Sequence, residues 1–259
     1  MIVAGIDVGS LTAKCVLFEE KVIAYSIAKV TPDLENTAKA VYSDAVKKAG
    51  VSAEYIVATG YGRNKVSFAN LKVTEITCHA FGAKSIFPSC RTVIDIGGQD
   101  SKVIAVENGV KNFVMNDKCA AGTGRFLEVM ASALNVDVSK LGELDEKADK
   151  PVNISSTCTV FAESEVVSYI AQGEKVENIV AGLHNAIASR IAAMAKRIDL
   201  KPDVVLTGGV AKNKGVKRAL EEILQIKILV PEEPQIVGAI GAAIVGKNYA
   251  SRGRKSERF

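Results

Sequence analysis

The sequence predicts an α/β protein built from two similar subdomains, and three observations support this fold class. Strand patterns alternate with amphipathic helix patterns along the 259 residues. A strand-turn-strand segment near the N-terminus recurs 88 residues later. Strands end in glycine turns at three places. With 48% hydrophobic and 24% charged residues, the chain is long enough for one large domain or two compact ones.

The first third of the chain reads as a strand meander, a helix and a further strand. The expected strands are residues 2–8, 15–18, 22–27 and 55–59. A helix is expected from about Leu34 to Ala49, because Thr31-Pro32-Asp33 is a suitable start and Gly50 a suitable C-cap. The expected later elements are a long amphipathic helix over 179–198, a strand over 204–207, a helix from about 213 to 224 and a small-residue helix face at 238–243.

Residues 6–22 match residues 94–110 without a gap at six of 17 positions. The identical pairs are Ile6 and Ile94, Asp7 and Asp95, Gly9 and Gly97, Lys14 and Lys102, Glu19 and Glu107, and Val22 and Val110. A chance likeness of two hairpins is the alternative. Duplication predicts two similar subdomains that face each other across a cleft.

Both copies place an Asp-x-Gly turn at the end of a strand. Glycine permits a tight turn and close approach of a phosphate to backbone N–H groups. The carboxylates of Asp7 and Asp95 would repel a phosphate, so the pattern indicates a Mg²⁺ ion with bound water between them. A third turn, Gly208-Gly209, could approach a base or ribose. The sequence lacks a GxxxxGK[ST] P-loop, and no GxGxxG follows the first strand, which disfavours P-loop and Rossmann folds.

Charge and hydropathy exclude several classes of partner. The net charge of +4 is too small to indicate nucleic acid, and no apolar run approaches the ~18 residues of a membrane span. The segment MIVAGIDVGS has no basic region or cleavage site, so we expect a cytoplasmic protein. Five cysteines without a CxxC pair argue against a disulfide framework and a self-contained zinc site.

Cys119 and Cys158 each lie directly ahead of an expected helix. The positive end of a helix dipole favours thiolate over thiol, which suits ligation or reactivity. Two thiolates are half of the four that an iron–sulfur cluster usually takes, and a two-fold dimer would supply the others. The alternative is that both are small buried apolar residues, as free cysteines usually are.

Three segments resemble the phosphate 1, phosphate 2 and adenosine motifs of the superfamily that contains acetate and sugar kinases, Hsp70 and actin. They are GIDVGSLTAK (5–14), VIDIGGQDSK (93–102) and VLTGGVAKN (205–213). The resemblance implies two ribonuclease-H-like subdomains that face each other across an ATP cleft. Subdomain I would comprise residues 1–88 and 236–250, and subdomain II, which carries Cys119 and Cys158, residues 89–235. Residues 251–259 would form a flexible tail.

Over residues 2–248 the chain resembles the ATP-dependent activators, or component A, of 2-hydroxyacyl-CoA dehydratases, a family shared with the ATPase subunits of benzoyl-CoA reductase. The matching strings are ATGYGRN (58–64), DIGGQDSK (95–102), NDKCAAGTGRF (116–126), SSTCTVFAESEV (155–166) and TGGVAKN (207–213). The family implies a homodimer with one [4Fe-4S] cluster held by Cys119 and Cys158 of both chains. It also implies that ATP hydrolysis changes the angle between the helices at the cluster and that one electron leaves at low potential.

The resemblance also implies partner proteins, and two alternative functions stay open. The electron acceptor would be an iron–sulfur protein: a dehydratase, a benzoyl-CoA-type reductase or a double-cubane cluster protein. The donor would be a ferredoxin or a flavodoxin. One rival is a small-molecule kinase of the same fold without a cluster, and the other is a nucleotide-regulated assembly protein of the actin type.

The expected site combines catalytic and nucleotide-binding residues. Asp7 and Asp95 would hold Mg²⁺ through water, and Gln99 would orient the attacking water, because an amide both donates and accepts. The residues expected to bind ATP or ADP are Gly9, Ser10, Leu11, Thr12, Lys14, Gly97, Gly98, Gly208 and Gly209.

Other residues in or near this site have different expected roles. Leu11 stands where the family usually has a small hydroxyl residue, so only its backbone N–H is expected to contact phosphate. Lys14 and Lys102 could neutralise phosphate or lie on the solvent side of their hairpins. The remaining cysteines and both histidines are expected to be structural: Cys15, Cys78, Cys90, His79 and His184.

Overall fold

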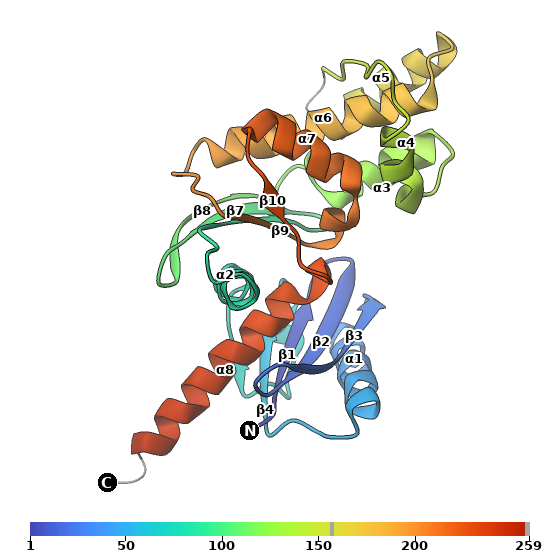
Figure 1. The fold of residues 1–259 in the computed structure, drawn as a ribbon. Coiled ribbons are helices and arrows are strands. Elements are labelled where there is room, and N and C mark those ends of the chain that lie inside the picture. The colour runs from blue at the N-terminus through green and yellow to red at the C-terminus, as the bar shows by residue number, and fades with distance from the viewer. Residues whose placement is uncertain (156–157, 257–259) are drawn as a thin grey trace. The chain divides into compact units, whose positions relative to one another are not determined.

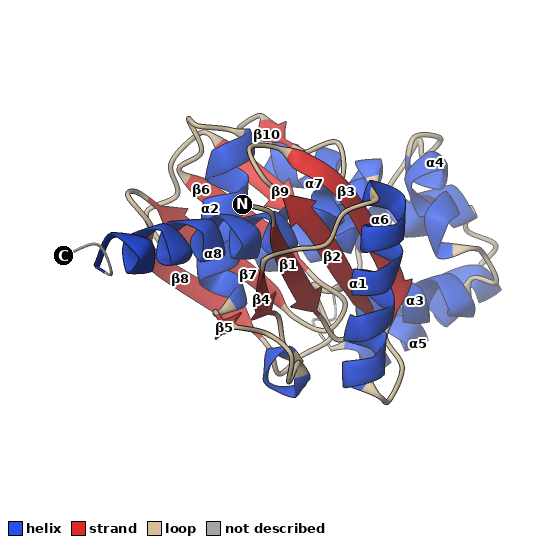
Figure 2. Ribbon diagram, turned by 90° about the horizontal axis from the view of Figure 1, so that it is seen from below, coloured by secondary structure: helices blue, strands red, loops and turns tan. Residues whose placement is uncertain are grey.

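The protein, seen here in a computed structural model that describes residues 1–155 and 158–256, divides into two compact units. Unit 1 comprises Met1–Cys90, Val106–Lys111 and the described chain from Pro231 onward. Unit 2 comprises Arg91–Ala105 and Asn112–Val230. Each unit contains a five-stranded sheet. Helices and strands both contribute to the fold throughout (Figure 2). The predicted α/β class is therefore confirmed, whereas the opposition of two subdomains across a cleft stays a prediction.

Unit 1 has the sheet order β3-β2-β1-β4-β5. Its strands are β1 (Val3–Val8), β2 (Thr12–Phe18), β3 (Val22–Lys29), β4 (Tyr55–Thr59) and β5 (Leu71–Lys72). Its helices are α1 (Leu34–Ala49), a 3-10 turn η1 (Arg63–Lys65), α2 (Glu75–Ile86), a 3-10 turn η4 (Pro234–Ile236) and α8 (Val237–Ser256).

Helices cover both faces of this sheet. On one face, Val41 and Ala45 of α1 pack with Ile6 and Leu17, and α1 ends at Gly50, which adopts the predicted left-handed C-cap with φ of 70°. On the other face α8 lies beside α2 (Figure 1). A side chain at Gly241 of α8 would collide with a carbonyl of α2, so the predicted small-residue face does bring two helices close together.

Helix α8 continues through Ser256. The flexible tail predicted at 251–259 stays a prediction: residues 251–256 have helical backbone, and residues 257–259 lie outside the described part of the chain. Among residues 1–155 and 158–256, no helix combines the length and apolarity that crossing a membrane requires.

Unit 2 has the sheet order β10-β9-β6-β7-β8. Its strands are β6 (Thr92–Ile96), β7 (Ser101–Val106), β8 (Val110–Asn116), β9 (Val204–Thr207) and β10 (Ile228–Leu229). Its helices are α3 (Gly124–Ala133), η2 (Val138–Lys140), α4 (Leu141–Asp145), α5 (Thr159–Ala171), α6 (Val176–Ala195), η3 (Gly209–Lys212) and α7 (Lys214–Leu224).

Helix α6 forms the centre of the core of unit 2. Its residues Ile179, Leu183, Ile187 and Ile191, spaced four apart, are all at most 1% exposed. They pack in one cluster with the sheet and with α3 and α7, which confirms that this helix is amphipathic and serves packing.

The register of the two sheets confirms the duplication. Asp7 lies opposite Lys14 in the antiparallel β1–β2 pair, and Asp95 lies opposite Lys102 in the β6–β7 pair. The neighbouring parallel strand is also equivalent, since β4 pairs with β1 as β9 pairs with β6. Both copies therefore present an aspartate, a turn and a parallel neighbour in the same arrangement.

Candidate functional site

Each duplicated hairpin carries an aspartate paired with a lysine that the strands hold out of water. Asp7 is 6% exposed, and its Oδ2 lies 3.6 Å from Lys14 Nζ. Asp95 is 4% exposed, and its Oδ2 lies 3.5 Å from Lys102 Nζ. Lys102 is only 3% exposed, so the alternative that it points to solvent is wrong. Each ion pair therefore holds its carboxylate in place at the end of a strand.

The two turns have the same internal hydrogen bond. The N–H of Gly9 donates to the carbonyl of Thr12 at 3.1 Å, and the N–H of Gly97 donates to the carbonyl of Asp100 at 2.9 Å. Both glycines thus shape their turns, and their N–H groups are used within them. The amides that stay candidates for phosphate belong to the turn tips: Ser10, Leu11, Gly98 and Gln99.

A Thr-Gly pair closes each site from the neighbouring strand. Thr59 lies in register with Asp7, and Thr207 with Asp95. The glycines that follow, Gly60 and Gly208, have φ of 85° and 87°. A side chain at either would collide with β1 or β6, so only glycine lets the chain turn this close to the aspartate. Sequence comparison at the 88-residue offset could not find this pair, because the spacing between the strands differs in the two copies.

The two polar residues of the second turn, Gln99 and Asp100, have different surroundings. Gln99 is exposed at the turn tip, where its amide can contact a bound molecule. Asp100 accepts from Lys102 Nζ at 2.7 Å and so helps to hold the buried lysine. Of these two side chains, Gln99 is the one whose position would let it contact a water molecule beside a bound ligand.

The five cysteines fall into two groups by exposure. Cys15, Cys78 and Cys90 are buried, and burial raises the pKa of both Cys15 and Cys78 to about 12. Cys119 is half-buried and Cys158 is exposed. Of the five thiols, these two are accessible to a ligand or metal, and their assignment as cluster ligands stays a prediction.

The two accessible cysteines differ in their relation to a helix. Cys158 is the N-cap residue of α5, as expected. Cys119 is not at a helix N-terminus, because a turn over residues 120–123 separates it from α3. The expected position directly before a helix is therefore confirmed for Cys158 and wrong for Cys119.

Polar contacts fix the backbone around Cys119. The side-chain amide of Asn116 donates to the carbonyls of Cys119 and Ala121, each at 2.9 Å. The hydroxyl of Thr123 donates to the carbonyl of Ala120 at 2.6 Å. The turn is thus held in one conformation in front of α3.

Two backbone hydrogen bonds connect this segment to the second Asp-x-Gly turn. The N–H of Gly124 donates to the carbonyl of Gly97, and the N–H of Arg125 donates to the carbonyl of Gly98, both at 2.8 Å. These donors are the first two residues of α3, whose N–H groups have no partner within the helix. A displacement of the turn would therefore pull directly on α3.

The donor chemistry fits an iron–sulfur cluster shared between chains. In the described part of the chain, no three His, Cys, Asp or Glu side chains gather as a metal site would require. Two accessible thiols per chain are what a shared four-cysteine set needs. Beside Cys158, the Thr159 hydroxyl is buried and has no hydrogen-bond partner among the described residues, so it can donate to an incoming acceptor.

Comparison with known proteins decides the family. The model of the BadF/BadG/BcrA/BcrD ATPase family matches residues 4–246. The chain belongs to this ATPase family. It is 48% identical over 255 residues to the (R)-2-hydroxyglutaryl-CoA dehydratase activating ATPase of Acidaminococcus fermentans, covering 96% of this chain and 98% of the relative.

Solved structures agree with this assignment. The activator of the 2-hydroxyisocaproyl-CoA dehydratase from Clostridium difficile with bound ADPNP has 42% sequence identity and a TM-score of 0.94, over 99% of this chain and 98% of that one. A ROK family glucokinase from Streptomyces griseus has 14% identity and a TM-score of 0.61, over 96% of this chain and 100% of that one. The second likeness shows that this ATPase has the sugar kinase fold.

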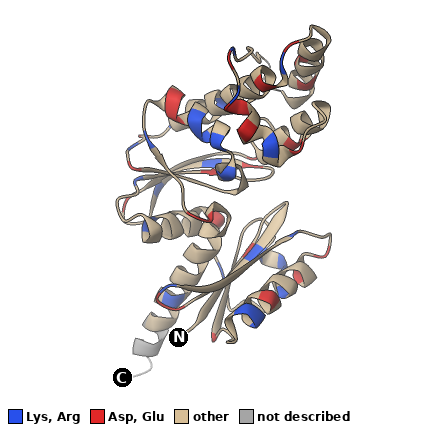
Figure 3. Ribbon diagram, turned by 45° about the vertical axis from the view of Figure 1, so that its right-hand side comes forward, with Lys and Arg blue, Asp and Glu red and all other residues tan. Residues whose placement is uncertain are grey.

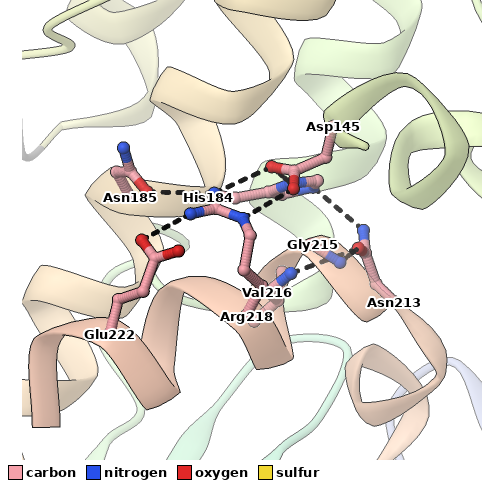
Figure 4. A network of polar contacts seen from close by, with 8 residues as sticks. All are labelled: Asp145, His184, Asn185, Asn213, Gly215, Val216, Arg218 and Glu222. Atoms are coloured by element: carbon pink, nitrogen blue, oxygen red, sulfur yellow. Dashed lines mark hydrogen bonds and ion pairs between the residues drawn. The ribbon is translucent and has the colours of Figure 1, made fainter. Parts of the chain in front are cut away.

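This ATPase contains a buried polar network that the sequence patterns do not predict. The ring of His184, expected to be structural, lies with Nδ1 2.8 Å from Asp145 Oδ1, a carboxylate oxygen that accepts the hydrogen bond (Figure 4). Arg218 binds the same carboxylate through Nε at 2.7 Å and Nη2 at 3.0 Å. Three helices, α4, α6 and α7, are joined by these contacts.

Elsewhere the helices of unit 2 carry interspersed charges of both signs (Figure 3).

Asp145 should make folding stability depend on acid pH. Burial alone would raise the pKa of Asp145, but hydrogen bonds from His184 and Arg218 outweigh it and lower the pKa from 3.8 to about 2. A carboxyl with a lowered folded-state pKa stabilises fully above pH 3.8 and loses that effect as pH falls through about 2. We expect Asp145→Asn to lose about 2 kcal/mol at neutral pH.

Denaturant unfolding of the wild type and Asp145→Asn between about pH 6 and pH 2 measures this contribution. The difference in unfolding free energy should shrink below about pH 4 and be smallest near pH 2. Glu20→Gln, at an exposed carboxylate, serves as the matched control and should change little. An Asp145→Asn deficit that stays constant over this range would contradict the account.

Proposed function

We propose that this ATPase is the electron-donating activator of an acyl-CoA dehydratase. In this proposal two chains form a homodimer, Cys119 and Cys158 of both chains bind one [4Fe-4S] cluster, and hydrolysis of MgATP drives transfer of one electron to the dehydratase. The names of the relatives support the partner class, and the ADPNP-bound relative supports the nucleotide. The donor would be a ferredoxin or flavodoxin.

The observation that carries the proposal is the pair of hydrogen bonds between the second turn and α3. The turn assigned to phosphate contains Gly97 and Gly98, whose carbonyls accept from the first two residues of the helix after Cys119. Helix α3 packs in turn against α5, the helix that begins after Cys158. A change in phosphate occupancy thus has a short route to Cys119 through hydrogen bonds and the chain, and to Cys158 through the packing of α3 on α5.

The surface of α5 supports the homodimer. Four of its large apolar side chains are 43–66% exposed, and they begin two residues after Cys158: Val160, Phe161, Val167 and Ile170. Several large exposed apolar side chains on one helix are unusual on a monomer. A second copy of the chain seated on this face would cover it and would bring the other two thiols to the same place.

The nucleotide chemistry would be divided between the two hairpins. Asp7 and Asp95 would hold Mg²⁺ through water, and the ion would neutralise phosphate charge that develops during hydrolysis. The amides at the turn tips, including Ser10 and Gly98, would bind phosphate oxygens. Gln99 would orient the water, and Gly208 would let the chain approach the adenosine. Because Lys14 and Lys102 hold the aspartates, they would act on phosphate mainly through these carboxylates.

Gly124→Pro tests the coupling between nucleotide and cluster. Gly124 is the first residue of α3, a position that tolerates proline, and Thr123 before it is extended with φ of −129° and ψ of 171°. Proline removes the N–H that donates to Gly97, and its ring Cδ takes the place of that hydrogen, so the Gly97 carbonyl must move away from α3. The variant should keep its iron and its ATP binding. The rate at which a ferrous chelator removes iron should no longer change when MgATP is added.

Gly124→Ala is the matched control, since it adds the same first carbon and keeps the N–H. It should respond to MgATP as the wild type does. A Gly124→Pro protein with the full wild-type response would show that the coupling takes another route. A wild type without iron or without ATP hydrolysis would overturn the proposed function itself.

A further inference from the structure

Asn213 ends the TGGVAKN segment and caps the helix that follows. Its Oδ1 accepts from the N–H groups of Gly215 at 2.9 Å and Val216 at 3.3 Å (Figure 4). Its Nδ2 lies 3.0 Å from His184 Nε2. One side chain therefore both caps α7 and contacts a histidine that is fully buried.

These contacts determine where the proton of His184 lies. Backbone N–H groups only donate, so the oxygen of Asn213 must face them and its NH₂ must face Nε2. An amide NH₂ also only donates, so Nε2 must carry the lone pair. The ring proton is then on Nδ1, which donates to Asp145. His184 is neutral, and the charge of Asp145 is balanced by Arg218.

The first turn of α7 leaves no room for another arrangement. A side chain at Gly215 would collide with Nδ1 of His184, so the helix lies directly on the imidazole ring. A rotation of Asn213 would unpair the helix N–H groups and a buried ring nitrogen together. The pair thus has one low-energy arrangement.

Both ends of the segment 207–213 are held in this way. At its start, the hydroxyl of Thr207 donates to Asp95 Oδ1 at 3.0 Å, and Gly208 lies against the carbonyl of Ile96. At its end, the N–H of Asn213 donates to Val210 at 2.9 Å and closes the η3 turn. The conformation of Gly208 and Gly209 thus depends on Asp95 at one end and on His184 at the other.

We propose that His184 is a positioning residue for the adenosine end of the nucleotide. By holding Asn213 in the rotamer that caps α7, it fixes the turn that Gly208 and Gly209 present to the adenosine. This inference rests on the proposed function, which assigns that turn to adenosine. It adds that affinity for adenosine, and not for phosphate, depends on a buried neutral histidine.

The test compares two ligands on the anaerobic holoprotein: MgADP and magnesium tripolyphosphate, which lacks adenosine. His184→Phe keeps an aromatic ring and removes both nitrogens. This variant should bind MgADP about tenfold more weakly and should bind tripolyphosphate with unchanged affinity. His184→Gln, whose carbonyl can accept from Asn213, should recover most of the affinity for MgADP.

Asn213→Ser gives a second, independent variant in case His184→Phe fails to fold. Serine keeps a helix cap and loses the contact with His184, so it should show the same selective loss for MgADP. Equal weakening of both ligands, or unchanged MgADP affinity, would overturn the positioning role. A wild type that binds tripolyphosphate but not MgADP would overturn the adenosine assignment as well, which separates the two failures.

Discussion

Asp95→Asn should lower ATP hydrolysis by about a hundredfold or more while the iron content stays at the wild-type level. The reason is that the amide keeps the shape of the carboxylate and loses the charge that would hold Mg²⁺ near the phosphates. The fold should tolerate the change. Asparagine can still accept from Thr207, and Lys102 keeps its 2.7 Å contact with Asp100.

Asp100→Asn is the control for this variant. It removes a neighbouring charge that contacts the same lysine but lies outside the proposed magnesium site, and it keeps the backbone hydrogen bond to Gly97. We expect it to retain most of the hydrolysis rate. Phosphate release with and without Mg²⁺ measures both variants, and an Asp95→Asn enzyme with the Asp100→Asn rate would remove Asp95 from the mechanism.

Cys158→Ala should remove the cluster completely. The side chain is exposed at the N-cap of α5, so its loss leaves no cavity in the core. A shared cluster would lose two of its four thiolates, because both chains of the dimer carry the change. Iron should fall from about two atoms per chain to nearly none, and the absorption of the cluster should disappear.

Cys90→Ala is the matched cysteine control, since this thiol is buried and has no place in the proposed ligand set. It should keep the wild-type iron and sulfide content. ATP hydrolysis in Cys158→Ala should persist, because the hairpins that carry Asp7 and Asp95 are unchanged. Full iron in Cys158→Ala by metal analysis would show that the ligand assignment is wrong.

Much of the fold could be predicted because it rests on local patterns and on a duplication. The identical pairs at an offset of 88 residues predict the equivalent registers of Asp7 with Lys14 and of Asp95 with Lys102. The C-cap at Gly50 and the buried stripe of α6 follow from residue type and spacing.

Other parts of the site depend on contacts between distant residues. Nothing in the spacing of Asp145, His184 and Arg218 indicates that α4, α6 and α7 meet there. The hydrogen bonds from Gly124 and Arg125 to the second turn are backbone contacts, which no residue type reveals. The sequence pattern also does not predict the turn that separates Cys119 from α3, because Ala120 and Gly122 mark the start of a helix only weakly.

The iron and sulfide content of the anaerobically purified protein, measured together with the mass of the assembly, tests the central claim most directly. The account predicts a dimer with about four iron atoms and about four sulfides per two chains. An iron-free dimer, or a monomer that carries a complete cluster, would contradict it.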